Sequence, residues 1–311
     1  MRSERSEESR PVHVPVMPRE VIELLDPQPG KVILDATVGL GGHSKEIVQR
    51  LQPDGLLIGL DRDQQALAVA KKTLAPWQHS CQLFHLNFTE AATALDVAGV
   101  KGIDGVIYDL GASQLQLGTA ERGFSFSEDA PLDMRMDRST GDTAADLLRR
   151  LSERELEEII RNYGEERFAR RIARRIVEAR RKMPIGTTGA LSRIIAEAVP
   201  RRGRISPQTR TFQALRIAVN HELDNIQAGL SDASRLLRSG GRLVAISFHS
   251  LEDRIVKTIL REQGKKGIYR VLTKKPLTAS REEVMQNRSS RSAKLRAAER
   301  TSEGIPERRS E

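Results

Sequence analysis

The sequence predicts an α/β protein with a mostly parallel sheet, into which an all-helical segment is inserted. Three observations carry this prediction. Short apolar runs rich in β-branched residues alternate with amphipathic helical patterns from about residue 30 to residue 110. The alternation then stops until about residue 216, and it resumes near residue 221. Because strand–helix–strand alternation is typical of parallel sheets with helices on both faces, we expect an α/β domain at 1–113 and 217–311, with a helical insert at 114–216.

The first part of the chain supplies four strands and two helices. Buried strands are expected where short apolar runs end in glycine or polar residues, at 31–38, 56–61, 81–88 and 103–110. Helices are expected between them, at 44–51 and 63–74, with Ser44 and Asp63 as N-caps.

The insert and the last part of the chain follow the same logic. Ser152 and Glu155 form a capping-box pattern, and a later helix has Phe168, Ile172 and Ile176 on one face and arginines on the other. Beyond the insert we expect a helix at 221–237, a turn at Gly240-Gly241, strands at 242–248 and 267–272, and a capping box made by Ser250 and Asp253.

Charge and cysteine content narrow the class of protein. The 51 basic and 42 acidic residues give a formal net charge of +9, and the basic residues gather at 167–182, 201–216 and 257–300. Such patches suit a polyanion such as nucleic acid, although any one of them is also compatible with a solvated helix face. A single cysteine excludes a disulfide framework, and the sequence shows no metal-ligand pattern.

No part of the sequence is typical of a membrane or secreted protein. Residues 1–10 are polar and charged, which is unlike a signal peptide, and no apolar run reaches the roughly 20 residues that span a bilayer. We therefore expect a cytoplasmic protein without a membrane partner.

A glycine-rich turn at 35–43 joins the first strand to the first helix. Glycines at such a turn let the backbone approach a ligand closely, both in dinucleotide-binding proteins and in other cofactor sites. Two details separate these alternatives. The third glycine of the dinucleotide fingerprint is replaced by Ser44, and the strand ends in Asp35. A carboxylate repels a pyrophosphate but attracts the sulfonium and ammonium groups of S-adenosylmethionine, so the pattern favours the methyl donor.

Two further residues fit a nucleoside-containing cofactor. Asp61 ends the second strand, where an acid accepts hydrogen bonds from ribose hydroxyls. The alternative, that Asp61 caps the next helix, is weaker because Asp63 is better placed for that role. Phe88 follows the third strand, and either it stacks near an adenine or it belongs to the core.

Asp109 ends the fourth strand, so we expect it to face the ligand cleft. An exocyclic base amine is a weak nucleophile, and a carboxylate that accepts its N–H protons directs its lone pair toward the methyl group. The alternative is that Asp109 only caps the following turn. His249 is a weaker candidate for a substrate contact, with packing as the alternative. For Phe124 and Phe126, stacking on a flipped base and core packing are equally compatible with the sequence.

Taken together, the motifs resemble the bacterial 16S ribosomal RNA cytosine-N4 methyltransferases that act at the decoding centre. The resemblance extends from about residue 13 to residue 300. The motifs that carry it lie at 35–43, 109–113, 121–126, 131–137, 163–169, 210–216, 247–254 and 291–300. Two departures occur: the family's Ser-Ser-Pro-Gln is Ser113-Gln114-Leu115-Gln116 here, without the proline that stiffens the loop, and its Asn-Pro is Asn287-Arg288.

The resemblance implies a Rossmann-like class I methyltransferase that uses S-adenosylmethionine and acts on 16S rRNA in the small ribosomal subunit. It also implies that donor contacts are made by Gly41, Gly42, His43, Asp61, Phe88, Asp109 and Gln116. The sequence does not give the oligomeric state, and a homodimer is one option.

Two other functions compete with methyl transfer. A nicotinamide-dependent oxidoreductase would use the same kind of turn, but Asp35 and Ser44 argue against it. An RNA-binding assembly factor that keeps the fold without catalysis would bind RNA independently of Asp109.

Overall fold

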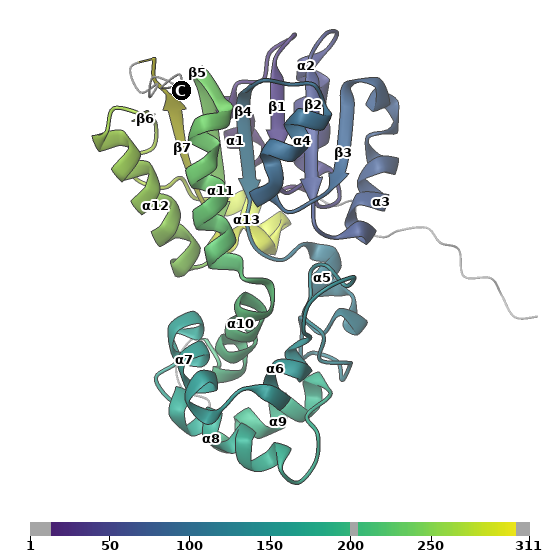
Figure 1. Cartoon of the computed structure of the whole chain (residues 1–311), viewed down its shortest axis with the longest axis vertical. Coiled ribbons are helices and arrows are strands. Elements are labelled where there is room, and N and C mark those ends of the chain that lie inside the picture. The colour runs from purple at the N-terminus through teal and green to yellow at the C-terminus, as the bar shows by residue number, and fades with distance from the viewer. Residues whose placement is uncertain (1–13, 200–204, 303–311) are drawn as a thin grey trace, which may run out of the picture.

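The computed structural model describes residues 14–199 and 205–302. The polar start at 1–10, Pro200, Arg201 and all but the first of the last ten residues lie outside these ranges. Within them, an α/β layer and a helical layer are stacked along the long axis of the molecule (Figure 1). None of the described helices is long and apolar enough to cross a bilayer.

The α/β layer contains a seven-stranded sheet with the strand order β3-β2-β1-β4-β5-β7-β6. The first five strands of this order are parallel, whereas β7 runs antiparallel to both of its neighbours. The strands are β1 (Val32–Asp35), β2 (Leu56–Asp61), β3 (Cys81–His85), β4 (Ile103–Asp109), β5 (Leu237–Ser247), β6 (Tyr269–Val271) and β7 (Lys294–Arg300). The parallel register brings the carboxyl ends of β1, β2 and β4 to one edge of the sheet.

Helices cover both faces of the sheet, as the alternating pattern predicts. One face packs under α4 (Ala91–Val97), α11 (Glu222–Leu236) and α12 (Ser250–Lys265). The other face packs under α1 (Pro18–Leu25) and α2 (Gly42–Leu51). The remaining elements of this layer are α3 (Gln64–Thr73), α13 (Arg281–Gln286) and the short 3-10 turns η1 (Ala75–Ser80), η2 (Phe88–Glu90) and η4 (Arg288–Ser292).

All six predicted strands are present, and β2 has the predicted bounds. Strand β3 stops at His85 because Asn87 caps η2, so Phe88 lies in that turn rather than in the strand. The predicted turn at Gly240-Gly241 is wrong: both glycines lie inside β5, which begins at Leu237. Strand β7 was not predicted, and it accounts for much of the basic segment at 291–300.

Two of the predicted helix caps are wrong. Helix α2 begins at Gly42, two residues before Ser44, with Gly41 as its N-cap. His249, not Ser250, caps α12, and its partner in the capping box is Glu252 rather than Asp253. Asp63 and Ser152 cap α3 and α7 as predicted.

Helical elements separated by loops follow β4 in the described residues up to the start of α11, with one long loop at 123–143. They comprise α5 (Gln114–Gly118), η3 (Ala120–Arg122), α6 (Ala144–Arg150), α7 (Glu153–Gly164), α8 (Ala169–Arg180), α9 (Thr188–Ala198) and α10 (Pro207–Asn220). Ile172 and Ile176 of α8 are buried, and Phe168 packs beside them, as the periodicity predicts. Helices α6 to α10 share a hydrophobic core of their own, which supports our proposal that residues 114–216 form an inserted domain.

Candidate active site

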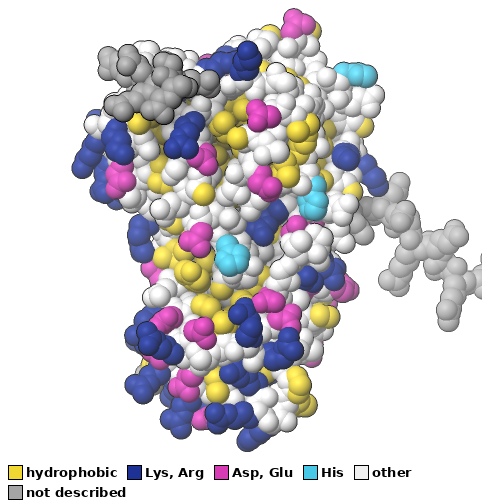
Figure 2. Space-filling model, viewed as in Figure 1, with side chains coloured by type: hydrophobic (Ala, Val, Ile, Leu, Met, Phe, Trp, Pro, Cys, Tyr) yellow, Lys and Arg dark blue, Asp and Glu magenta, His cyan; other side chains and the backbone are white. Residues whose placement is uncertain are grey.

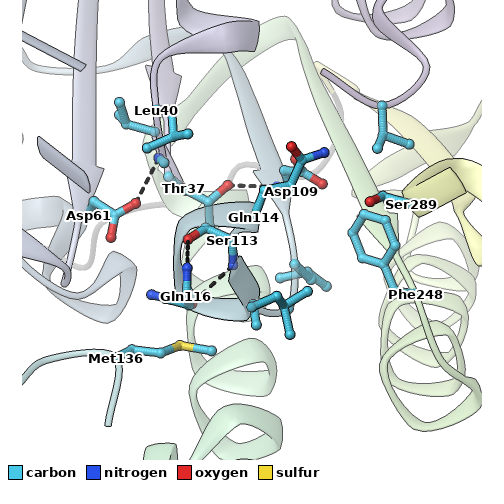
Figure 3. Close-up of a pocket in the computed structure, with 18 of the residues that line it drawn as sticks. Thr37, Leu40, Asp61, Asp109, Ser113, Gln114, Gln116, Met136, Phe248 and Ser289 are labelled. Carbon is cyan, nitrogen blue, oxygen red and sulfur yellow. Dashed lines mark hydrogen bonds between the residues drawn. The ribbon is translucent and has the colours of Figure 1, made fainter. Parts of the chain in front are cut away.

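A cavity of about 360 Å³ lies at the carboxyl ends of β1, β2 and β4. Its walls come from the turn before α2, from α5, from α11 and from η4, and Figure 3 shows the side chains around it. Open parallel sheets bind ligands at this edge. Six of the seven predicted donor contacts line the cavity: Gly42, His43, Asp61, Phe88, Asp109 and Gln116.

The seventh residue, Gly41, does not line the cavity but shapes the turn. Its backbone is left-handed, with φ of 86°, and its N–H donates to the Val38 carbonyl over 2.8 Å. A Cβ at this position would touch Ala70 and Thr73 of α3 at 3.4 Å. The turn therefore requires glycine, and it brings the first residues of α2, Gly42 and His43, to the cavity wall.

Asp35 lies beneath the turn and is almost fully buried. Its carboxylate accepts hydrogen bonds from the Ser44 hydroxyl (2.6 Å) and from the Thr37 N–H (3.1 Å). Burial raises the pKa of Asp35 to about 6. Ser44 therefore holds the acid instead of capping the helix, and Asp35 can act on a ligand only through its charge, because it is not part of the cavity wall.

Asp61 lies at the end of β2, beside the turn that carries Leu40 (Figure 3). One carboxylate oxygen accepts from the Gly39 N–H over 2.7 Å, and the other accepts from the Asp63 N–H over 2.8 Å. Burial raises the pKa of Asp61 to about 6. Each carboxylate oxygen keeps a second lone pair, so Asp61 can still accept a hydrogen bond from a ligand hydroxyl. Asp63 is the helix cap, which removes the competing role for Asp61.

Asp109 ends β4 at the centre of the cavity. Its backbone N–H donates to the Thr37 hydroxyl over 2.6 Å, while its Oδ1 has no hydrogen-bond partner in the described part of the chain. His43 Nε2 lies 3.7 Å from the other oxygen, Oδ2. Burial raises the pKa of Asp109 to about 8, and the charges of Asp35 and Glu252 act in the same direction. The role of Asp109 as a simple turn cap receives no support, since Ser113 caps the following helix.

Phe88 and Gln116 line the cavity, and each side chain also makes contacts that stabilise the fold. Phe88 contacts the Tyr108 ring edge-on at 5.6 Å and packs closely on Gly229 of α11. The Gln116 amide accepts from the Ser113 N–H and donates to Asp63 over 2.9 Å. Ser113 and Gln116 thus form a capping box, which fixes the loop at 113–116 that lacks the family's proline.

The sequence interpretation missed an ion-pair network that joins the insert to the cavity wall. Arg216 of α10 donates two hydrogen bonds of 2.9 Å to Glu222, and it lies 3.9 Å from Glu252. Glu222, His249 and Glu252 offer ligand atoms within 4.8 Å of one another, a cluster that the sequence alone did not indicate; the expectation of no metal site stays a prediction. Arg216 already provides the positive charge beside these carboxylates. The signal was hidden because His249 and Glu252 lie well beyond Arg216 and Glu222 in the sequence, and only the fold brings the start of α12 to them.

Packing accounts for His249 and Phe124, whereas Phe126 is 37% exposed and its stacking on a base stays a prediction. His249 caps α12 and is not part of the cavity wall. Phe124 is buried, and Phe126 contacts Phe212 of α10 with ring centroids 4.9 Å apart, so both aromatic rings pack within or against the insert. Met136, Arg288 and Arg291 line the cavity without having been singled out individually.

The sheet and the cavity together define a class I methyltransferase: a Rossmann-like sheet with an antiparallel β7 between β5 and β6, and a ligand cavity beside the glycine turn. Residues 10–301 match the model of the MraW methylase family, and the chain belongs to that family.

Several curated relatives are similar along nearly their whole length. Ribosomal RNA small subunit methyltransferase H of Pelobacter propionicus is 51% identical over 307 residues, which cover 93% of this chain and 98% of the relative. The protein of the same name from Geobacter sulfurreducens is 51% identical over 306 residues, with the same coverage. That of Caldicellulosiruptor bescii is 46% identical over 304 residues, covering 93% of this chain and 99% of the relative.

Proposed function

We propose that this protein transfers a methyl group from S-adenosylmethionine to the exocyclic N4 amine of a cytosine in 16S rRNA of the small ribosomal subunit. The observation that carries the proposal is the group of carboxylates around the glycine turn. Asp35, Asp61 and Asp109 all have raised pKa values because burial disfavours their charge. A cation beside these buried carboxyl groups stabilises their ionised forms, whereas a pyrophosphate would disfavour those forms further. The site therefore favours the methyl donor over a dinucleotide. The names of the relatives support rRNA as the substrate.

The donor would be held by the residues around the turn. When bound, it supplies an electrophilic methyl group on a cationic sulfur. The open backbone at Gly42, held in place by the turn at Gly41, gives it room, Asp61 accepts from its ribose hydroxyls, and Phe88 packs on its base. His43 and Gln116 complete the wall on either side.

Asp109 would orient the cytosine amine. Its side chain lines the cavity and is about a quarter exposed there, so the carboxylate can accept an N–H of the amine. That hydrogen bond directs the nitrogen lone pair toward the methyl group, and the carboxylate then takes the proton that the nitrogen loses. With a pKa of about 8 in the free protein, Asp109 is a stronger base than an ordinary aspartate.

The pH dependence of the reaction should report this carboxyl group. Only the ionised form of Asp109 accepts the amine proton, so kcat/KM for the donor should rise about tenfold per pH unit below an inflection near pH 8. Positive charge on the bound donor favours the ionised carboxylate, so kcat/KM for RNA at saturating donor should have its inflection at lower pH. An unchanged inflection in the Asp109→Asn variant would assign the titration to another group.

Donor affinity should depend on Asp61. The Asp61→Asn variant is expected to bind S-adenosylmethionine at least about tenfold more weakly, since a hydrogen bond to a charged group contributes about 1.5–3 kcal/mol. Isothermal titration calorimetry measures the change. Asp54→Asn provides the control, because Asp54 is exposed and precedes the same strand at its far end. If the two variants bound S-adenosylmethionine with equal affinity, Asp61 would not be a donor-binding residue.

Two experiments separate methyl transfer from its competitors. Binding of NAD but not S-adenosylmethionine, measured by thermal shift, would favour the oxidoreductase. Mapping of rRNA methylation in a deletion strain tests the substrate: loss of one N4-methylcytosine in 16S rRNA is expected, whereas an unchanged level would rule the function out and favour an assembly factor.

We also propose that the protein works in the cytoplasm, where its substrate is assembled. For the oligomeric state, a homodimer remains a prediction that analytical ultracentrifugation tests directly.

A further inference from the structure

A second pocket, of about 440 Å³, lies at the edge of the sheet between α12 and β6. It shares no lining residue with the candidate active site. Its walls are formed by Lys257, Leu260, Arg261, Gly264, Lys265, Tyr269, Val271, Thr273, Lys274 and Arg296. Half of these residues are basic and none is acidic, which distinguishes this pocket from the carboxylate-rich cavity.

The basic side chains come mainly from one face of α12. Lys257, Arg261 and Lys265 are spaced four residues apart, so they form a single row along the helix. Lys274 joins them from the segment after β6. Figure 2 shows Lys and Arg side chains along the edge of the molecule where α12 lies in Figure 1. Like charges four residues apart on a helix destabilise it by about 0.2–0.5 kcal/mol per pair, so this row has a cost in the free protein.

Most of this charge is not neutralised by the protein itself. Arg296 pairs with Asp253 at 2.7 Å. Lys257, Arg261, Lys265 and Lys274 are exposed, and within residues 14–199 and 205–302 they form no ion pair. On α8 of the insert, by comparison, Arg174 and Arg175 both pair with Glu178, whereas the exposed Arg170 and Arg171 form no ion pair with any described residue. The helix dipole accounts for Lys265 in the last turn of α12 but not for Lys257 and Arg261.

We propose that this pocket binds phosphate groups of the RNA backbone and anchors the substrate away from the reacting base. The location of the site follows from the row of unpaired cations. That the polyanion is RNA rests on the proposed function. Phosphates displace condensed counterions when they meet Lys and Arg, so such a pocket adds affinity without reading sequence.

The test compares two variants that lose the same charge. In the first, Lys257, Arg261 and Lys265 are all changed to glutamine; in the control, the exposed Lys71, Lys72 and Lys101, which lie on α3 and before β4, are changed in the same way. Fluorescence anisotropy with a labelled 16S rRNA fragment measures affinity between 50 and 200 mM KCl. Each lost phosphate contact lowers the slope of log K against log salt by about 0.7–0.9, so the first variant should lose about 2–3 in slope and about tenfold in affinity at the lowest salt.

Further measurements make the result decisive. The first variant should keep the melting temperature and the affinity for S-adenosylmethionine, since none of its three residues contacts the cavity. Equal losses in both variants would reduce the effect to net charge and overturn the anchor. Unchanged RNA binding together with lost binding of inorganic pyrophosphate would also overturn it, in favour of a small-anion site. Wild-type protein that binds RNA through this row but transfers no methyl group would contradict only the proposed function.

Discussion

The Asp109→Asn variant is expected to transfer methyl groups at least about 100-fold more slowly than the wild type, with donor affinity changed much less. The expectation follows from the position of the carboxylate, which ends β4 in the cavity with Oδ1 unpartnered among the described residues. An asparagine of the same shape can still accept one hydrogen bond through its oxygen, but it cannot take a proton. Positioned proton acceptors typically contribute about 10²–10⁴-fold to a rate.

Single-turnover assays with labelled donor and small subunits measure this effect without interference from product release. Asp96→Asn is the matched control, because Asp96 is exposed on α4, away from the cavity. A variant of Asp109 that retains more than about a tenth of the wild-type rate would contradict the assigned role. A lower melting temperature of that variant would instead point to a structural role, which the unpartnered oxygen does not suggest.

The Arg122→Met variant is expected to lose about 3–5 kcal/mol of the free energy of unfolding. Arg122 is 1% exposed and forms an ion pair with Asp63, the cap of α3, at 2.8 Å. It also donates to the carbonyls of Arg135 and Met136, so one guanidinium ties the start of the insert to the α/β layer. Removing it leaves the Asp63 charge buried with only the Gln116 amide and backbone N–H groups as donors.

Urea denaturation, followed by circular dichroism, measures this loss. Arg138→Met serves as the control: Arg138 also pairs with an aspartate, Asp133, at 3.4 Å, but its side chain is about half exposed, so the cost should stay below about 1 kcal/mol. Similar losses of unfolding free energy in the two variants would show that the buried ion pair does not stabilise the contact between the layers more than an exposed pair does.

Local patterns in the sequence were sufficient for the strands that carry the site. Runs such as the one at β2 are apolar, short and bounded by polar residues, and parallel strands place their carboxyl ends together. That alone brings Asp61 and Asp109 to one edge. Strand β7 was missed because Lys294, Arg296 and Glu299 interrupt its apolar residues, so that it reads as a charged tail until β5 and β6 pair with it.

Features that depend on how separate helices and strands pack together were not predictable. Ser44 matches a helix cap locally, yet its hydroxyl is used by Asp35 nine positions earlier, because Gly41 lets the helix start sooner. The pairing of Arg216 with Glu222 and its approach to Glu252 needs the folded arrangement of α10, α11 and α12. Neither contact can be predicted from composition or periodicity.

The central claim is that a carboxylate-lined cavity transfers a methyl group to a cytosine amine of 16S rRNA. The most direct test incubates the purified protein and unmethylated small subunits with S-adenosylmethionine that carries a deuterated methyl group, followed by nucleoside mass spectrometry of the 16S rRNA. We expect one labelled N4-methylcytosine per subunit with the wild type and almost none with Asp109→Asn at the same time point. Label on another nucleoside, or no label although the donor binds, would contradict the account.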